Sequence, residues 1–167
     1  MPSPASYVPH PHLTFSASPD QRMEAKIQEL LDIQEIRDIS IRYNRYADAA
    51  DGDSFASLWL DDGEFDIHGD KVYKGHEEIA FACRAATEVL HFVVDSQVTV
   101  EGETARQTSK LLLFHRDQPE RKDIEFACTT TLSDVFVKRD GKWYIKYRQS
   151  KIDMDKDSAF RKMKLVR

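Results

Sequence analysis

Cysteine and glycine are scarce in this sequence, which has two cysteines and six glycines among 167 residues. Two cysteines, Cys83 and Cys128, are too few for a disulfide-built framework, so we expect both to be small buried side chains in a reducing cytoplasm. The sequence has no glycine loop that would cradle a phosphate, no nucleophile elbow and no paired-cysteine zinc motif. These absences argue against nucleotide-dependent chemistry, serine hydrolysis and structural zinc, and we expect neither a cofactor nor a metal.

Long basic runs and long apolar runs are also missing. The 24 lysines and arginines are outnumbered by 29 aspartates and glutamates, and a net charge of -5 argues against a nucleic-acid partner. The longest apolar runs, such as Leu111 to Phe114, are far shorter than the roughly 20 residues that cross a bilayer. The first residues also lack the basic and apolar regions of a signal peptide. We therefore expect a cytoplasmic protein that binds a small molecule and makes no membrane contact.

Proline is concentrated at one end of the chain, because five of the six prolines lie at positions 2, 4, 9, 11 and 19. Each removes a backbone hydrogen-bond donor and biases the preceding residue against helix, so residues 1–20 are predicted to form an N-terminal arm. Its residues Tyr7, Val8 and Phe15 are apolar enough to pack on the body or on a neighbouring subunit. Residues 21–160 are predicted to form one domain, and residues 161–167 a tail.

The spacing of apolar residues changes along the chain from a helical to a strand period. A helix start at Ser18 is followed by helical spacing to Ala50, which predicts two helices or one kinked helix. A second short helix is expected to end near a turn at residues 61–63. The pattern then predicts a hairpin over 64–73, a helix over 76–86 and strands over 89–94, 97–100, 105–116, 124–138 and 142–152. This order predicts an α+β cone-shaped barrel, in which a strongly curved antiparallel or mixed sheet wraps helices around an apolar pocket.

Three polar residues stand out in this pattern. On the strand at 89–94, alternation places His91 on the same face as Val89 and Val93, which is either a pocket wall or the site of a hydrogen-bonded core histidine. His115 lies either on the corresponding face of its strand or at the surface near a loop. Asp48 lies roughly 100° around the helix from the apolar stripe, which is equally compatible with a solvated aspartate.

Several short motifs resemble those of a known family. They are Ile36-Arg37-Asp38-Ile39, Phe55-Ala56-Ser57-Leu58-Trp59, Asp61-Asp62-Gly63-Glu64-Phe65, Tyr73-Lys74-Gly75, Leu90-His91-Phe92 and Arg139-Asp140-Gly141-Lys142-Trp143. Together they resemble SnoaL-like domains of the nuclear-transport-factor-two superfamily over residues 27–152. Within it the sequence is most similar to the lyase branch, which includes scytalone dehydratase, hexachlorocyclohexane dehydrochlorinase and bile acid 7α-dehydratase.

The resemblance implies roles for seven residues. Asp48 and His91 match the catalytic aspartate and histidine of the lyase branch, and Tyr43 matches a catalytic tyrosine of the bile-acid enzyme. The same comparison implies that four further residues contact the substrate: Arg148, His115, Trp59 and Phe65. In such a pair the carboxylate orients the imidazole and favours its protonated form, so that the histidine can take and return a proton.

The functional expectation is a cofactor-independent lyase or isomerase that acts on a small hydrophobic substrate of aromatic, polyketide or steroid-like character. The alternative is a ligand-binding or assembly domain, such as the small subunit of a ring-hydroxylating dioxygenase, in which Asp48 and His91 form a merely structural pair. A third class, epoxide hydrolysis, would depend on carboxylates more than on histidine. The apolar arm, together with an outer sheet face carrying Phe126, Phe136 or their neighbours, predicts a homodimer or homotrimer.

Overall fold

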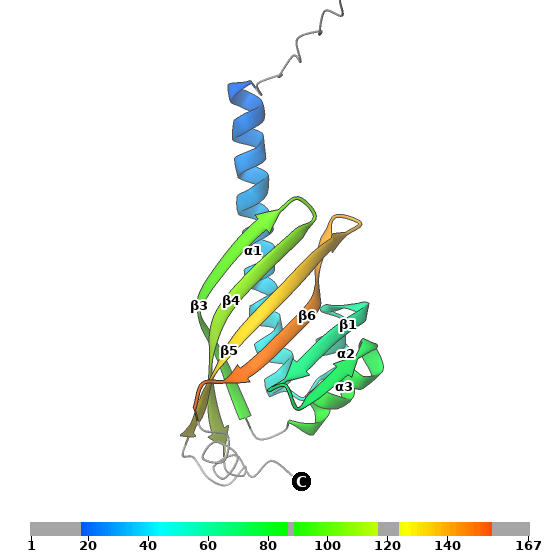
Figure 1. Cartoon of the computed structure of the whole chain (residues 1–167), viewed down its shortest axis with the longest axis vertical. Helices are drawn as coiled ribbons and strands as arrows, with labels where there is room; N and C mark the ends of the chain where they lie inside the picture. Colours follow the sequence, from blue (N-terminus) through cyan, green and yellow to red (C-terminus); the bar gives the residue numbers. More distant parts are fainter. Residues whose placement is uncertain (1–17, 87–88, 117–123, 155–167) are drawn as a thin grey trace, which may run out of the picture.

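The computed structural model describes residues 18–86, 89–116 and 124–154, and it contains three helices and one curved sheet over these ranges (Figure 1). Residues 1–17 of the predicted arm (residues 1–20) and the predicted tail (residues 161–167) lie outside the described residues, whereas residues 18–20 form the start of α1. The elements are α1 (Pro19–Asp48), α2 (Gly52–Ala56), β1 (Trp59–Ile67), β2 (Lys71–Lys74), α3 (Gly75–Ala85), β3 (Val89–Glu101), β4 (Thr104–Arg116), β5 (Ile124–Arg139) and β6 (Lys142–Ile152). No helix in the described ranges is both long and apolar enough to cross a membrane.

The first helix begins where the sequence indicates. Ser18 caps α1 by accepting a hydrogen bond from the backbone N–H of Gln21, and the Gln21 side chain accepts one from the backbone N–H of Ser18. Pro19 occupies the first turn, where a missing donor costs nothing. The helix continues for 30 residues as one element, so of the two predicted alternatives, two helices or one kinked helix, the structure has a single helix.

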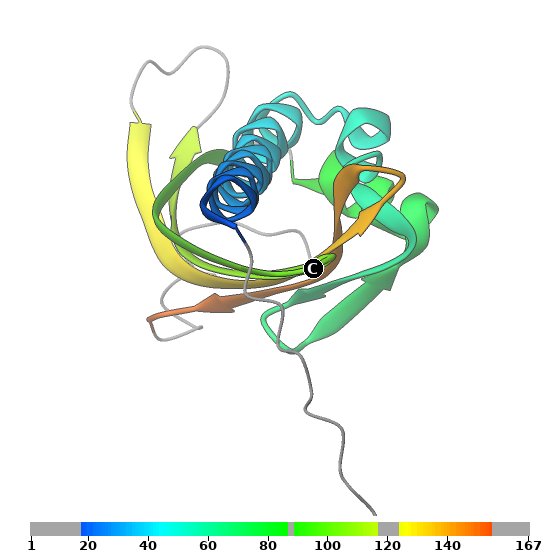
Figure 2. The ribbon, with the colours of Figure 1, turned by 90° about the horizontal axis from the view of Figure 1, so that it is seen from above.

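The sheet is mixed and open, with the strand order β2-β1-β6-β5-β4-β3. Strand β1 pairs in parallel with β6, whereas all the other neighbours pair antiparallel. Seen from above, the sheet curls around α1, and α2 and α3 lie beside it (Figure 2). The expected α+β cone is therefore confirmed.

The main core lies between α1 and the inner face of the sheet. Ile36, Ile39 and Tyr43 of α1 pack there with Phe136 and Ile145 of the long strands. Phe136 is fully buried, so its expected place on the outer face is wrong. Phe126, in contrast, is 44% exposed.

The segment after α2 also departs from the expectation. Trp59 starts strand β1 instead of lying in the predicted short helix, and residues 61–63 lie within that strand instead of forming a turn. The pairing of β1 with β6 shifts register between Trp59 and Glu64, which marks a bulge. A Cβ on Gly63 would lie 2.9 Å from the carbonyl oxygen of Leu60, so the bulge requires glycine there.

Candidate functional site

A cavity opens between α1, α3 and the inner face of the sheet. It holds about 710 Å³ of empty space, its open mouth included. The lining residues come from seven of the elements, and most of them are apolar, including Tyr43, Phe55, Phe65, Leu111 and Leu113. The cavity therefore suits a small hydrophobic molecule.

His91 and Asp48 meet at the wall of this cavity. Oδ1 of Asp48 accepts a hydrogen bond from Nδ1 of His91 at 2.7 Å and another from the backbone N–H of His91 at 3.0 Å. The side chains are 10% exposed for His91 and 27% exposed for Asp48. Because a carboxylate can only accept, the proton of the neutral ring is on Nδ1, and Nε2 carries the lone pair. The imidazole is thus held in the tautomer that a general base needs.

The chain positions these two residues by different means. Asp48 is the last residue of α1. His91 is the third residue of β3, which is the terminal strand on one side of the sheet and lies next to α1. Val89 and His91 both line the cavity, as the alternation in the sequence predicts. A carboxylate at the C-terminal end of a helix is opposed by the helix dipole, so the two hydrogen bonds from His91 offset an unfavourable position.

Tyr43 lies beside the hydrogen-bonded pair of Asp48 and His91, which we call the dyad. Its ring stands edge-on to the His91 imidazole, with 6.3 Å between ring centres, and it also contacts Phe55 and Phe65. Burial raises the pKa of Tyr43, while the nearby charge of Arg148 partly opposes that rise. The hydroxyl is therefore protonated at neutral pH and able to donate a hydrogen bond.

Arg148 lies behind Tyr43, with its guanidinium carbon 4.1 Å from the ring centre. Its Nε and Nη2 donate to the two carboxylate oxygens of Asp134 at 2.7 and 2.8 Å, and both side chains are fully buried. Burial favours the neutral guanidine, but Asp134 outweighs it and the pKa of Arg148 is raised. Arg148 supports the cavity floor through Tyr43 and is not among the described residues that line the cavity.

The other three residues that are expected to contact the substrate differ in their position relative to the cavity. Phe65 lines the cavity. Trp59 is buried behind it, with 5.4 Å between the ring centres. His115 is 5% exposed on β4, opposite Val89, so the surface position considered for it is wrong. Within the described ranges, neither Trp59 nor His115 belongs to the cavity lining.

Both cysteines are buried, as expected, and Cys83 lines the cavity. Burial raises the pKa of the Cys83 thiol to about 11. At neutral pH the group is therefore a thiol and not a nucleophilic thiolate.

His68 is a cavity residue that the sequence pattern did not reveal. It follows the end of β1, and its backbone has a φ of 61°, in the left-handed region that favours glycine. The carbonyl of Ser150 accepts hydrogen bonds from the backbone N–H of His68 at 2.6 Å and from its Nδ1 at 3.0 Å. The adjoining turn residues Gly69 and Asp70 were the only sequence signal, and they indicate a turn without indicating a site.

Known structures similar to this chain share its fold. An NTF2-like protein with a cystatin-like fold from Novosphingobium aromaticivorans is 25% identical with a TM-score of 0.71, covering 87% of this chain and 95% of that chain. A proposed scytalone dehydratase from the same organism is 22% identical with a TM-score of 0.67, covering 77% and 89%. A type 2 hexachlorocyclohexane dehydrochlorinase is 18% identical with a TM-score of 0.67, covering 77% and 90%.

The family assignment comes from the sequence itself. No curated protein matches the chain. A family model described as a SnoaL-like domain matches residues 28–149, which include α1 from its third turn onward and nearly all of the sheet. The chain therefore belongs to the SnoaL-like domain family of the NTF2-like superfamily.

Proposed function

We propose that this protein is a cofactor-independent lyase or isomerase, in which His91 is the general base and acid. The observation that carries the proposal is the 2.7 Å hydrogen bond from His91 Nδ1 to Asp48 at the wall of an apolar cavity. Two similar structures, the proposed scytalone dehydratase and the dehydrochlorinase, bear the names of elimination catalysts and support the same class of reaction.

The reaction starts with proton removal from carbon. Nε2 of His91 takes the proton, and the carboxylate of Asp48 stabilises the imidazolium that forms. Negative charge then develops on a substrate oxygen, and the protonated hydroxyl of Tyr43 can donate a hydrogen bond to it. Elimination expels a leaving group, whereas isomerisation returns the proton to a different carbon.

The lining of the cavity supports a hydrophobic substrate. The walls contain aromatic rings from Tyr43, Phe55 and Phe65 and aliphatic side chains from Leu111 and Leu113. Burying apolar surface against such walls contributes roughly 25 cal/mol for each Å². We infer a small hydrophobic substrate with an acidic C–H bond, of aromatic, polyketide or steroid-like character.

The test is proton exchange in a probe ketone. The ketone 2-tetralone has an aromatic ring and an acidic C–H bond, and its exchange in deuterium oxide can be followed by mass spectrometry. The wild-type protein should accelerate exchange, and Asp48→Asn and His91→Ala should each lower the rate by about 10² to 10⁴. Asp38→Asn is the matched control, because Asp38 is an exposed aspartate on the same helix.

The assembly alternative makes the opposite prediction. If the pair were only structural, His91→Ala would lose about 1 to 3 kcal/mol of stability, and neither variant would change the rate per folded molecule. Melting temperatures measured beside the exchange rates separate the two accounts. Exchange no faster than in buffer, or equal for all the variants, would contradict the proposal.

A further inference from the structure

The cavity contains a second imidazole, that of His68, which has no role in the mechanism proposed for Asp48 and His91. His68 is held twice by the carbonyl of Ser150, once through its backbone N–H and once through Nδ1. A carbonyl can only accept, so Nδ1 carries the proton in the neutral ring and Nε2 carries the lone pair. Both cavity histidines are thus fixed through Nδ1 by a protein oxygen.

The backbone at His68 supports a specific role for this side chain. A non-glycine residue with a φ of 61° is disfavoured, and the turn continues with Gly69 at a φ of 72°. Asp66 stabilises this turn by accepting a hydrogen bond from the backbone N–H of Gly69 at 2.9 Å. An imidazole is therefore placed where glycine would fit with less strain, and its ring is anchored at the cavity.

The topology places the two histidines on separate walls. His91 is on β3, the last strand at one end of the sheet, whereas His68 follows β1, the second strand from the other end. The curl of the sheet seen in Figure 2 brings these two ends to one cavity. A bound molecule can therefore be contacted by His91 on one side and by His68 on the other.

We propose that His68 is a second catalytic residue, which binds the oxygen substituent of an apolar substrate whose C–H bond faces His91. This inference rests on the proposed function and deepens it, because it makes the substrate a hydroxyl-bearing hydrophobic molecule. During elimination His91 takes the proton from carbon, the C–H electron pair forms the new double bond, and the C–O bond breaks. Protonated His68 gives its proton to the departing oxygen, which leaves as water. Proton transfer through solvent then resets both rings.

The two rings have different anchors. Asp48 offers His91 a full negative charge, which stabilises the ring after it has gained a proton. Ser150 offers Nδ1 of His68 a carbonyl oxygen, and the carboxylate of Asp66 interacts electrostatically with His68. Each ring therefore has a carboxylate near it when it carries the extra proton.

The test compares the binding of 2-naphthol and naphthalene by calorimetry. A purely apolar cavity binds naphthalene more tightly, because the hydroxyl of 2-naphthol must be desolvated. We expect the wild-type protein to bind 2-naphthol about three to ten times more tightly than naphthalene, since the hydroxyl gains a hydrogen bond to His68. His68→Asn should abolish the preference, because asparagine tolerates positive φ and keeps a donor near the position of Nδ1. His76→Asn, at a histidine on α3 outside the cavity lining, is the matched control.

Three outcomes would overturn this role for His68. They are an absence of naphthol preference in the wild-type protein, an undiminished preference in His68→Asn, and loss of the preference only in a His91 variant. The measurement is binding and not turnover, so it is independent of the exchange assay that tests the dyad. Failure of exchange with an intact His68 effect would remove the lyase proposal and leave a hydroxyl-binding cavity.

Discussion

Asp48 has a charge that its own helix disfavours. Asp48 is the last residue of α1, at the end of the helix toward which the backbone carbonyls point. Its carboxylate is stabilised by two hydrogen bonds, from the backbone N–H and from Nδ1 of His91 on β3. Asparagine at this position keeps the size of the side chain and removes the unfavourable charge. We therefore expect the stability of Asp48→Asn to change by no more than about 1 kcal/mol, since lost charge-assisted bonding is offset by relief at the helix end.

The dyad should behave as one unit in a double-mutant cycle. If Asp48 acts only by orienting and supporting His91, then Asp48→Asn has nothing left to impair once His91→Ala has removed the base. The double variant should exchange 2-tetralone protons at nearly the rate of the slower single variant. Losses that multiply, giving a double variant far slower than either single variant, would show that the two residues act independently.

Cys83 should make the protein less stable in alkali. Its folded pKa is about 11 against an ordinary value of 9.0, so the stabilising difference is complete below pH 9 and is lost as the pH rises toward 11. Full loss amounts to about 3 kcal/mol. Urea unfolding at pH 8 and pH 11 should show a smaller decline for Cys83→Ala than for the wild-type protein. An identical decline in both proteins would contradict this assignment.

At the scale of the element, α1 has two apolar stripes on opposite faces. Ile36, Ile39 and Tyr43 face the core, whereas Met23, Ile27, Leu30, Leu31 and Ile41 are each at least 50% exposed. At roughly 100° per residue the exposed set shares one face of the helix, which we call the outer stripe. From the sequence alone, both sets of apolar residues fit one helical pattern. The helical spacing of apolar residues does not show which face of the helix is buried.

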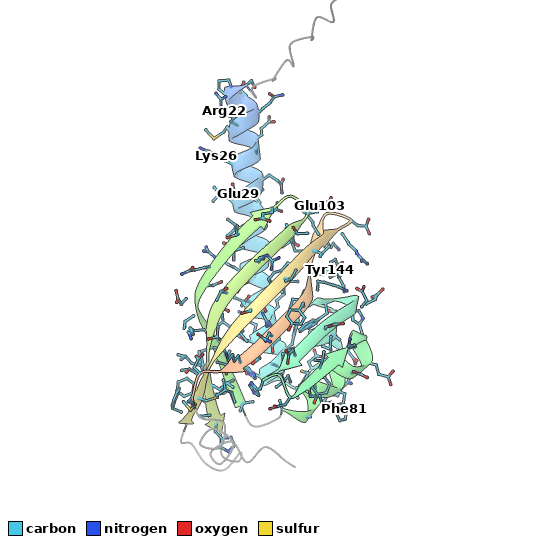
Figure 3. All side chains as sticks on the ribbon, in the orientation of Figure 1. Arg22, Lys26, Glu29, Phe81, Glu103 and Tyr144 are labelled. Carbon is cyan, nitrogen blue, oxygen red and sulfur yellow. The ribbon has the colours of Figure 1, made fainter. Side chains whose placement is uncertain are left out.

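The outer stripe lies largely on a part of α1 that extends beyond the sheet, where Arg22, Lys26 and Glu29 are labelled in Figure 3. Every residue from 18 to 31 is exposed. One flank of the stripe carries Arg22, Lys26 and Glu29, and the other carries the acidic residues Asp20 and Glu24. In a parallel pair of identical helices, opposite flanks meet, so Arg22 and Lys26 of one helix face the acidic flank of the other. We propose that a second copy of this chain covers the outer stripe.

Charged substitutions in the stripe should dissociate this dimer. Leu30→Glu combined with Leu31→Glu leaves the core residues unchanged and removes two apolar contacts from each helix. Sedimentation at micromolar concentration should give a dimer for the wild-type protein and a monomer for the variant. Phe81→Glu, at a 61% exposed residue on α3, is the matched control and should remain dimeric. A wild-type monomer would contradict the proposal.

Strand β5 shows why its outer face was only partly predictable. Phe126 and Phe136 are ten residues apart, and simple alternation places them on one face. The register with β4 shifts between Leu113 and Phe114, so that Phe114 pairs with Phe126 and Leu113 with Cys128. This bulge turns Phe126 outward, where Phe92, Phe114 and Phe126 form a row of edge-to-face rings, while Phe136 stays in the core. A single inserted residue leaves no clear mark in the hydrophobic pattern.

At the scale of the whole molecule, the site depends on contacts between distant segments. The sequence predicted the fold class, most element positions and, by family resemblance, the two residues of the dyad. It could not predict His68, because the role of that residue depends on Ser150, 82 positions away. It also did not reveal the parallel pairing of β1 with β6, which brings Ile67 beside Ser150 from a distant part of the sequence.

The cavity as a whole can be tested by filling it. Ala82 lies on α3 and lines the cavity, so Ala82→Phe places a ring in the empty space. We expect at least a tenfold loss of 2-naphthol affinity, because the ligand and the new ring need the same volume, with the fold retained in circular dichroism spectra. Unchanged affinity would mean that the ligand binds elsewhere.

The pairing of β1 with β6 has a consequence for the order in which the cavity is completed during synthesis. As the ribosome releases the chain, Asp48 and His91 emerge before the C-terminal third. Ser150 belongs to β6, the last of the described strands to be synthesised, and its carbonyl cannot hold His68 until that strand has inserted beside β1. Such long-range pairing is slow to form. A nascent chain stopped before residue 142 would therefore lack the contact that holds His68 on the wall opposite His91.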